Sequence, residues 1–238
     1  MDVVMIRLDK YLADMGVGTR SEVKKYVKQG KVSIDGAVVK SADIKIDVES
    51  QKVMFQGAVI GYEEFEYYML HKPAGVVSAT TDAKDKTVID LISDKKRKDL
   101  FPVGRLDKDT EGLLLITNDG DMAHRLLAPK KHVDKVYFAR VDGKITEEDV
   151  RVFAQGVSIG QGEVAKPAKL EILKADEISE IEVTIQEGKF HQVKRMFHTI
   201  GKEVIYLKRL SMGSLVLDES LPLGAYRKLT REEVEELC

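Results

Sequence analysis

The first thirty residues have the apolar spacing of two short amphipathic helices. The first apolar stripe falls at i, i+3, i+4 and i+7, and Gly16 and Gly18 follow it as stop signals. Its members are Leu8, Tyr11, Leu12 and Met15. Thr19 and Glu22 then have the form of a capping box, which predicts a second helix that ends at Gly30. Its apolar face comprises Val23, Tyr26 and Val27.

A β-hairpin and a linker are expected next. Two apolar runs, 31–34 and 37–39, flank Asp35-Gly36, a pair that is typical of a tight hairpin turn with positive φ. Residues 47–66 include Gly57, Gly61 and an acidic run, and we interpret them as the end of this module followed by a short linker. We therefore place a domain boundary near Gly61, which gives domains 1–61 and 62–238.

The rest of the chain combines predicted strands with a few helices. The expected strands are Tyr67–His71, Val76–Ala79, Leu113–Ile116, Lys135–Val141, Ala168–Leu173 and Ser179–Gln186. Helices are expected after the capping pair at Thr146, within 192–200, and after the capping pair at Thr230. Because strands and helices do not alternate regularly, we predict an α+β domain with a mixed, largely antiparallel sheet.

Composition indicates a protein that folds without covalent staples. The chain has 238 residues, of which 43% are hydrophobic, so it can bury a substantial core. Its one cysteine, Cys238, cannot close an internal disulfide, which favours a reducing compartment. No run of about 18 apolar residues occurs. We therefore expect a soluble cytoplasmic protein without a membrane segment.

Positive charge gathers on the second helix although the formal net charge of the chain is −2. Five cations fall within twelve residues that contain one acid, Glu22. They are Arg20, Lys24, Lys25, Lys28 and Lys31. By itself such a helix more often has a solvated face than a binding surface. However, the order of two helices and a hairpin resembles the S4 RNA-binding domain, on residues 7–12, 20–23 and 30–36. The resemblance implies that these five cations contact RNA phosphates.

Motifs of several common chemistries are missing from the sequence. It contains no phosphate-binding P-loop, no dinucleotide-binding glycine motif, no nucleophile elbow and no zinc-protease motif. The five histidines, at 71, 124, 132, 191 and 198, lack the spacing of a metal ligand set, so we predict no metal. One polar loop, 104–112, leads into the apolar run at 113–116, and an Asp119-Gly120 turn is expected to follow. Asp107 in this loop is either a turn former or a reactive carboxylate.

The same loop carries a resemblance to the pseudouridine synthases of the RsuA and RluA type. Gly104-Arg105-Leu106-Asp107 with Thr110 resembles their central motif. Segments 72–75, 135–137 and 187–197 resemble their other motifs, in the expected order. The resemblance implies a cofactor-free isomerisation of uridine in RNA. It also implies that Asp107 is catalytic.

The resemblance implies further site residues, although the sequence pattern alone favours an ordinary structural or surface role for several of them. Lys194 would pair with Asp107, and Tyr137 would stack on the extruded base. RNA contacts are implied for Arg105, Arg195 and Lys72. From pattern alone, Tyr137 is more often a core aromatic, a Lys-Arg pair more often a solvated face, and Lys72 before proline a turn residue. A helix over 192–200 would place Lys194 away from the apolar stripe of Val193, Met196, Phe197 and Ile200.

Similarity in 72–82, 165–168 and 190–197 is greatest to the small-subunit branch of that family. It implies modification of 16S rRNA at uridine 516, on free RNA or on a small-subunit assembly particle. We expect the protein to act as a monomer. The alternatives are a synthase of 23S rRNA, a non-catalytic S4-type assembly factor, and a glycosidic hydrolase in which Asp109 or Glu111 assists Asp107. We also expect the acids to lie away from the cleft, as in the glutamates 232, 233, 235 and 236.

Overall fold

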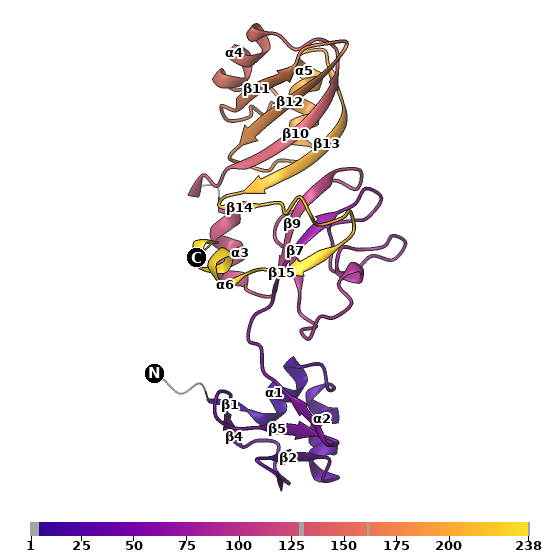
Figure 1. Cartoon of the computed structure of the whole chain (residues 1–238), viewed down its shortest axis with the longest axis vertical. Coiled ribbons are helices and arrows are strands. Elements are labelled where there is room, and N and C mark those ends of the chain that lie inside the picture. The colour runs from indigo at the N-terminus through magenta and orange to yellow at the C-terminus, as the bar shows by residue number, and fades with distance from the viewer. Residues whose placement is uncertain (1–4, 129–130, 161, 238) are drawn as a thin grey trace. The chain divides into compact units, whose positions relative to one another are not determined.

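The computed structural model describes residues 5–128, 131–160 and 162–237, so Cys238 lies outside the described residues (Figure 1). The chain forms two compact units. The first comprises Met1–Glu66 and Asp94–Leu100, and the second comprises Tyr67–Ser93 and Phe101–Cys238.

The first unit contains the two predicted helices and the predicted hairpin. Helices α1 (Leu8–Asp14) and α2 (Arg20–Lys28) bury one face each, and the capping box of Thr19 and Glu22 is present. Strands β2 (Val32–Ile34) and β3 (Ala37–Val38) pair antiparallel. Asp35 and Gly36 adopt φ of 50° and 85°, which is the backbone that a tight hairpin requires. These elements confirm the sequence prediction.

The stretch interpreted as the end of the module and a short linker contains a second hairpin. Strands β5 (Val53–Phe55) and β6 (Ala58–Ile60) pair antiparallel, and β5 also pairs with β2. Gln56 and Gly57 form the turn at φ of 50° and 84°. A further pair joins β1 (Met5–Arg7) to β4 (Lys45–Asp47). Residues 53–60 therefore belong to the module, whose end was expected before Gly61, although strands of three residues are too short for their alternation to be predicted.

A distant segment, Asp94–Leu100, completes the first unit. The buried carboxylate of Glu66 accepts hydrogen bonds from the backbone N–H groups of Lys96 (3.0 Å) and Arg97 (2.8 Å). The guanidinium of Arg97 is only 8% exposed and lies 3.3 Å from Asp14 of α1. It also donates to Asp99. Backbone hydrogen bonds to Glu66 and the ion pair between Arg97 and Asp14 therefore attach this segment to the rest of the unit.

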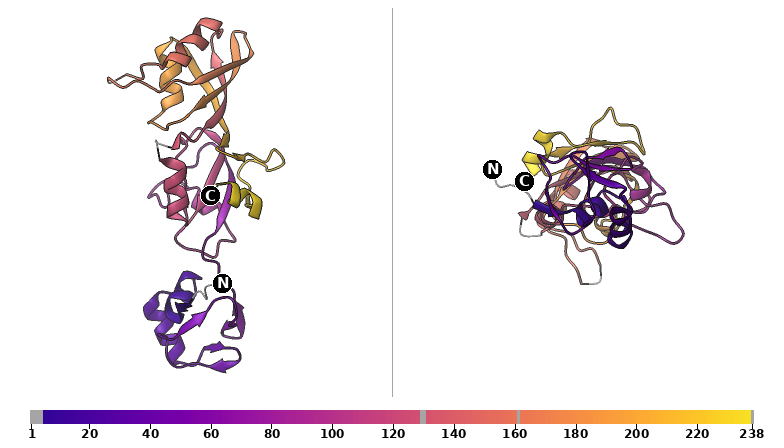
Figure 2. Two further views of the ribbon diagram at one scale, coloured as in Figure 1. Left: turned by 90° about the vertical axis from the view of Figure 1, so that its left-hand side faces the viewer. Right: turned by 90° about the horizontal axis from the view of Figure 1, so that it is seen from below.

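The second unit is built on one nine-stranded sheet (Figures 1 and 2). The main strand order is β11-β12-β10-β13-β9-β7-β15, with β14 beside β13 and β8 beside β9. All these pairings are antiparallel except the one between β13 and β9. The strands are β7 (Tyr67–Lys72), β8 (Phe101–Pro102), β9 (Glu111–Thr117), β10 (Lys135–Asp142), β11 (Lys169–Lys174), β12 (Ile178–Ile185), β13 (Glu203–Met212), β14 (Leu215–Val216) and β15 (Tyr226–Lys228). The predicted α+β class with a mixed, largely antiparallel sheet is confirmed.

Helices cover different parts of this sheet. Helices α4 (Glu147–Gln155) and α5 (Gln192–Thr199) lie together over the β11 to β13 half, where the rings of Phe153 and Phe197 meet at 4.8 Å (Figure 1). Helices α3 (Gly120–Leu127) and α6 (Arg231–Leu237) share a second apolar cluster with β7 and β9, to which they contribute Met122 and Leu237. A short 3-10 turn, η1 (Ile89–Leu91), lies between β7 and β8 in the sequence.

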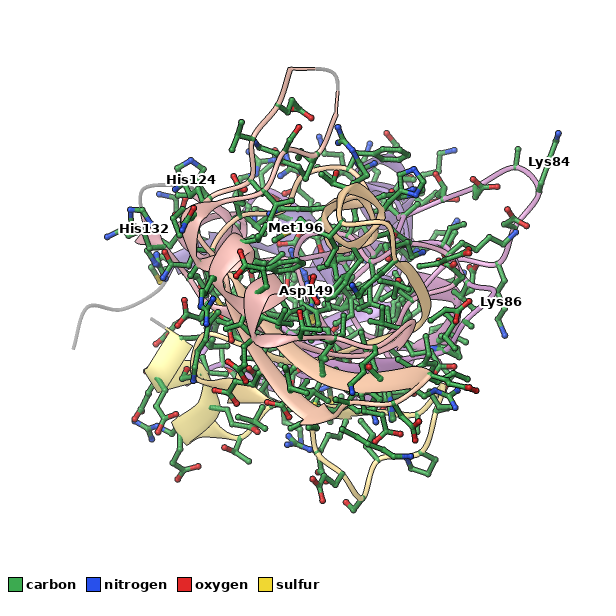
Figure 3. All side chains as sticks on the ribbon, turned by 90° about the horizontal axis from the view of Figure 1, so that it is seen from above. Lys84, Lys86, His124, His132, Asp149 and Met196 are labelled. Atoms are coloured by element: carbon green, nitrogen blue, oxygen red, sulfur yellow. The ribbon has the colours of Figure 1, made fainter. Side chains whose placement is uncertain are left out.

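Two local predictions in this unit were wrong. Val76–Ala79 is not a strand, because only Val77 makes a bridge, to Thr87, within a long loop after β7. Lys84 and Lys86 project from this loop (Figure 3). The Asp119-Gly120 pair is not a turn either, because the Asp119 side chain accepts from the N–H of Met122 and caps α3. The ten-residue strand β13 was not predicted at all.

Gly112 permits the close parallel pairing of β9 with β13. It pairs with Arg209 at φ of 105°, and a Cβ atom there would lie 2.2 Å from the carbonyl oxygen of Arg209. We predict that Gly112→Ala lowers the free energy of unfolding by roughly 3 kcal/mol, through overpacking and backbone strain. Urea unfolding measures this. Gly120→Ala is the matched control, since a Cβ there meets nothing within 4 Å. Equal stability of Gly112→Ala and wild type would contradict the prediction.

Candidate active site

Contacts of the residues next to Asp107 fix the backbone of the loop that precedes β9. Leu106 is buried, and its carbonyl oxygen accepts from the Ser78 hydroxyl at 2.9 Å. The N–H of Leu106 donates back to the same hydroxyl oxygen at 3.1 Å. Gly104 supplies a positive φ of 76° at the start of the loop. The backbone on the N-terminal side of Asp107 is therefore fixed by one buried serine.

Lys72, at the end of β7, fixes the other side of the loop. Its side chain is fully buried, and its ammonium donates to the carbonyl oxygens of Asp107 (3.0 Å), Lys108 (3.3 Å) and Thr110 (2.8 Å). A fourth acceptor is the carbonyl oxygen of Pro73, at 3.1 Å. This position contradicts the expected contact between Lys72 and RNA. The sequence showed that position 72 has a cationic side chain, but it did not show that this side chain points into the protein.

Two basic side chains lie beside the carboxylate of Asp107. The Lys194 ammonium, on α5, lies 3.3 Å from one carboxylate oxygen of Asp107 and 2.6 Å from a carboxylate oxygen of Asp109. The His191 imidazole lies 3.6 Å from the other oxygen of Asp107. The hydrogen bond from Lys194 lowers the pKa of Asp109. The structure thus brings Asp107 and Lys194 together as expected. It adds Asp109 as a second partner of Lys194, and His191 beside Asp107, and neither contact was predicted.

A cavity of about 690 Å³ opens beside Asp107. Tyr137, on β10, contributes to its wall and is only 7% exposed. Five lysines and arginines line the cavity: Arg105, Lys108, Lys135, Lys189 and Arg209. Two carboxylates line it, Asp107 and Glu187. Burial and then the charge of Arg209 lower the pKa of Lys135. The wall of this cavity therefore has more cationic than anionic side chains, although the net charge of the chain is −2.

The remaining predicted cations divide into exposed and internal ones. Arg105 is exposed at the rim. Arg195 instead donates to the carbonyl oxygen of Ile159 (2.6 Å) and to the carboxylate of Glu163 (2.9 Å). Its side chain is therefore used within the protein, so the expected RNA contact of Arg195 is not supported by this arrangement. In the first unit, all five predicted cations are exposed on or just after α2: Arg20, Lys24, Lys25, Lys28 and Lys31.

Acidic residues of α6 are engaged away from this cavity. Arg227 pairs with Glu233, and Arg231 pairs with Glu235. None of the four glutamates of α6 contributes to the cavity wall. Among residues 5–128, 131–160 and 162–237, no three His, Cys, Asp or Glu side chains form a candidate metal site. Within the same residues, no helix is long and apolar enough to cross a membrane.

Comparisons with known proteins agree with this geometry. The family model described as RNA pseudouridylate synthase matches residues 66–199, and the S4 domain model matches residues 6–52. The chain belongs to the RNA pseudouridylate synthase family. It is 51% identical, over 96% of its length and 97% of the relative, to an uncharacterised RNA pseudouridine synthase of Bacillus subtilis.

Other relatives of this RNA pseudouridylate synthase carry names that refer to either ribosomal subunit. It is 40% identical to ribosomal small subunit pseudouridine synthase A of Haemophilus influenzae, over 98% of the chain and 99% of the relative. It is also 40% identical to ribosomal large subunit pseudouridine synthase B of Bacillus subtilis, over 98% and 96%. A crystal structure of a pseudouridylate synthase superposes with a TM-score of 0.69 at 39% identity, covering 98% of this chain and all of that one.

The buried ammonium of Lys72 predicts a pH dependence of stability. Burial lowers the pKa of Lys72 from 10.5 to about 8, so between these values the unfolded chain binds more protons than the folded one. Stability should therefore rise with pH in this window, by up to about 3 kcal/mol. Lys72→Met lacks this rise, although the loss of the hydrogen bonds makes it less stable throughout. Urea unfolding of both proteins between about pH 7 and pH 10.5 tests this. Parallel curves would contradict it.

Proposed function

We propose that this chain isomerises a uridine of 16S rRNA to pseudouridine, with uridine 516 as the expected target. The observation that carries the proposal is the Asp107 carboxylate, 3.3 Å from the Lys194 ammonium and at the wall of a cationic cavity. We further propose that the protein works as a monomer in the cytoplasm. Its substrate is free 16S rRNA or a small-subunit assembly particle.

The reaction needs a carboxylate but no added group. The bond from ribose C1′ to N1 breaks, the uracil turns, and C1′ joins C5, so no atoms are gained or lost. An ionised Asp107 attacks C1′, or it stabilises or deprotonates the ribose as the base departs. Lys194 supplies an opposite charge 3.3 Å from the Asp107 carboxylate. No metal or cofactor enters this chemistry.

The cavity suits a base that has left its helix. A uridine inside structured RNA is extruded before its C1′ bond can be reached, and enzymes hold such a base against aromatic or apolar side chains. Tyr137 and Leu106 supply those surfaces beside Asp107. Arg105, exposed at the rim, contacts the RNA or fills the gap that the extruded base leaves.

The S4 domain supplies the anchor for the RNA. The exposed cations of α2 contact phosphates, which position the RNA without reading its sequence. The similarity of segments 72–82, 165–168 and 190–197 to the small-subunit branch favours 16S rRNA over 23S rRNA. An assembly factor without activity would not need a carboxylate opposite a cation within a cavity.

Release of tritium from uridine C5 tests the reaction and the role of Asp107 together. Joining C1′ to C5 expels the hydrogen at C5, so wild-type protein should release tritium from 16S rRNA labelled there. Asp107→Asn keeps the shape and removes the charge, so we predict loss of turnover with RNA binding nearly unchanged. Free uracil would identify a hydrolase. Release from 23S rRNA alone would identify the other ribosomal substrate, and tight binding without release would favour the assembly factor.

The S4 domain is tested separately by changing charge on α2. Lys24→Ala combined with Lys28→Ala should weaken RNA binding and flatten its dependence on salt, by roughly one unit of slope for each phosphate that is no longer neutralised. Binding titrations at several salt concentrations measure this. The matched control is Lys144→Ala combined with Lys174→Ala, which removes the same charge from the second unit outside the cavity. Equal slopes for both double variants would contradict the proposed anchor.

A further inference from the structure

Phe190 is an apolar side chain that folding leaves in water. At 71% exposure it is the most exposed large hydrophobic residue of the described chain. Its ring does not extend freely, because it stacks on the His191 imidazole with 3.8 Å between ring centres and 17° between planes. A single exposed apolar residue needs no explanation, but a flat stack of two rings beside an active site does.

The turn between β12 and α5 holds this stack in place. His191 adopts φ of 47°, a backbone that a non-glycine residue rarely takes. The carbonyl oxygen of Phe190 accepts from Arg195 at 3.2 Å, and the N–H of Lys189 donates to the Gln192 side chain at 2.9 Å. Arg195, which was expected to contact RNA, thus fixes the backbone of Phe190 instead. These contacts hold the backbone on both sides of the stack.

Its location connects it to the reaction centre. Phe190 and His191 both line the cavity beside Asp107, and the His191 imidazole lies 3.6 Å from the Asp107 carboxylate. Arg105 lines the same cavity and is exposed, so it can meet a phosphate next to a bound base. Tyr137, by contrast, is almost fully buried. In the proposed function it contacts the target base.

We infer that the Phe190–His191 stack is a platform for the nucleobase adjacent to the extruded uridine. This inference rests on the proposed function. When a uridine leaves the RNA stack, its neighbour loses a stacking partner, and an aromatic face held in position replaces it. Such stacking is tolerant of sequence, because every base offers a π-face. The platform therefore lowers the cost of extrusion without selecting the neighbour by hydrogen bonds.

Substitutions at Phe190 test the platform on a fragment of the rRNA that wild-type protein modifies. If the 16S proposal is wrong, the tritium-release experiment shows it first, because that experiment identifies the rRNA that is used here. Phe190→Ala and Phe190→Leu should each lower kcat/KM by about 10- to 100-fold, mainly through KM, while Phe190→Tyr stays within about threefold. Leu223→Ala is the matched control, since Leu223 is 52% exposed and lies outside the cavity. Full activity of Phe190→Ala or of Phe190→Leu would overturn the inference.

A double-mutant cycle with the RNA identifies the stacked base. The base on one side of the target uridine, and then the base on the other, is replaced by an abasic site. At one of the two positions, the abasic RNA should lower wild-type activity as much as Phe190→Ala does on intact RNA. The combination should lose no more than either change alone. Losses that multiply at both positions would show that Phe190 stacks on neither neighbour and would overturn the inference.

Discussion

The candidate active site depends on one buried positive charge. Lys72 brings an ammonium to the end of β7, where water cannot reach it, and four backbone carbonyl oxygens of the same region replace the lost hydration. Three of those carbonyls belong to Asp107, Lys108 and Thr110. The ammonium is therefore stabilised only when their loop has this conformation, and the ammonium in turn stabilises that conformation. A loop that moved would leave the ammonium unpaired, and a neutral residue would leave the carbonyls unpaired.

The other charged side chains of the second unit are distributed unevenly between the cavity and the rest of its surface. Lys194 is shared between Asp107 and Asp109, so the carboxylate outside the cavity wall competes for the cation that the candidate catalytic one uses. The cavity contains more cations than acids, whereas α6 has acids that pair with arginines of its own surroundings. A net charge of −2 is therefore compatible with an RNA enzyme, because the sign at the site differs from the sum.

Sequence reasoning succeeded where a local rule determines local structure. The helix stripe from Leu8 to Met15, the Thr19 capping box and the Asp35-Gly36 turn each follow from a few neighbouring residues, and all three are present. It did not find β13, whose alternating positions are partly exposed, or Asp119 as a helix cap. The sequence also did not predict where the side chains of Lys72 and Arg195 point, because their partners are carbonyls and carboxylates far away in the sequence. Residue type shows that a cation is present, whereas tertiary packing decides what that cation binds.

The contribution of Asp94–Leu100 to the first unit has a consequence for how the two units are related by the chain. The polypeptide passes between them after Glu66, after Ser93 and after Leu100. Consequently, a single truncation of the chain cannot remove the whole unit that contains the S4 domain. A truncation at Tyr67 would remove Asp14, an ion-pair partner of Arg97, and Glu66, which accepts from the Arg97 backbone N–H. Exchange of RNA-binding domains between relatives of this architecture requires that both segments be exchanged together.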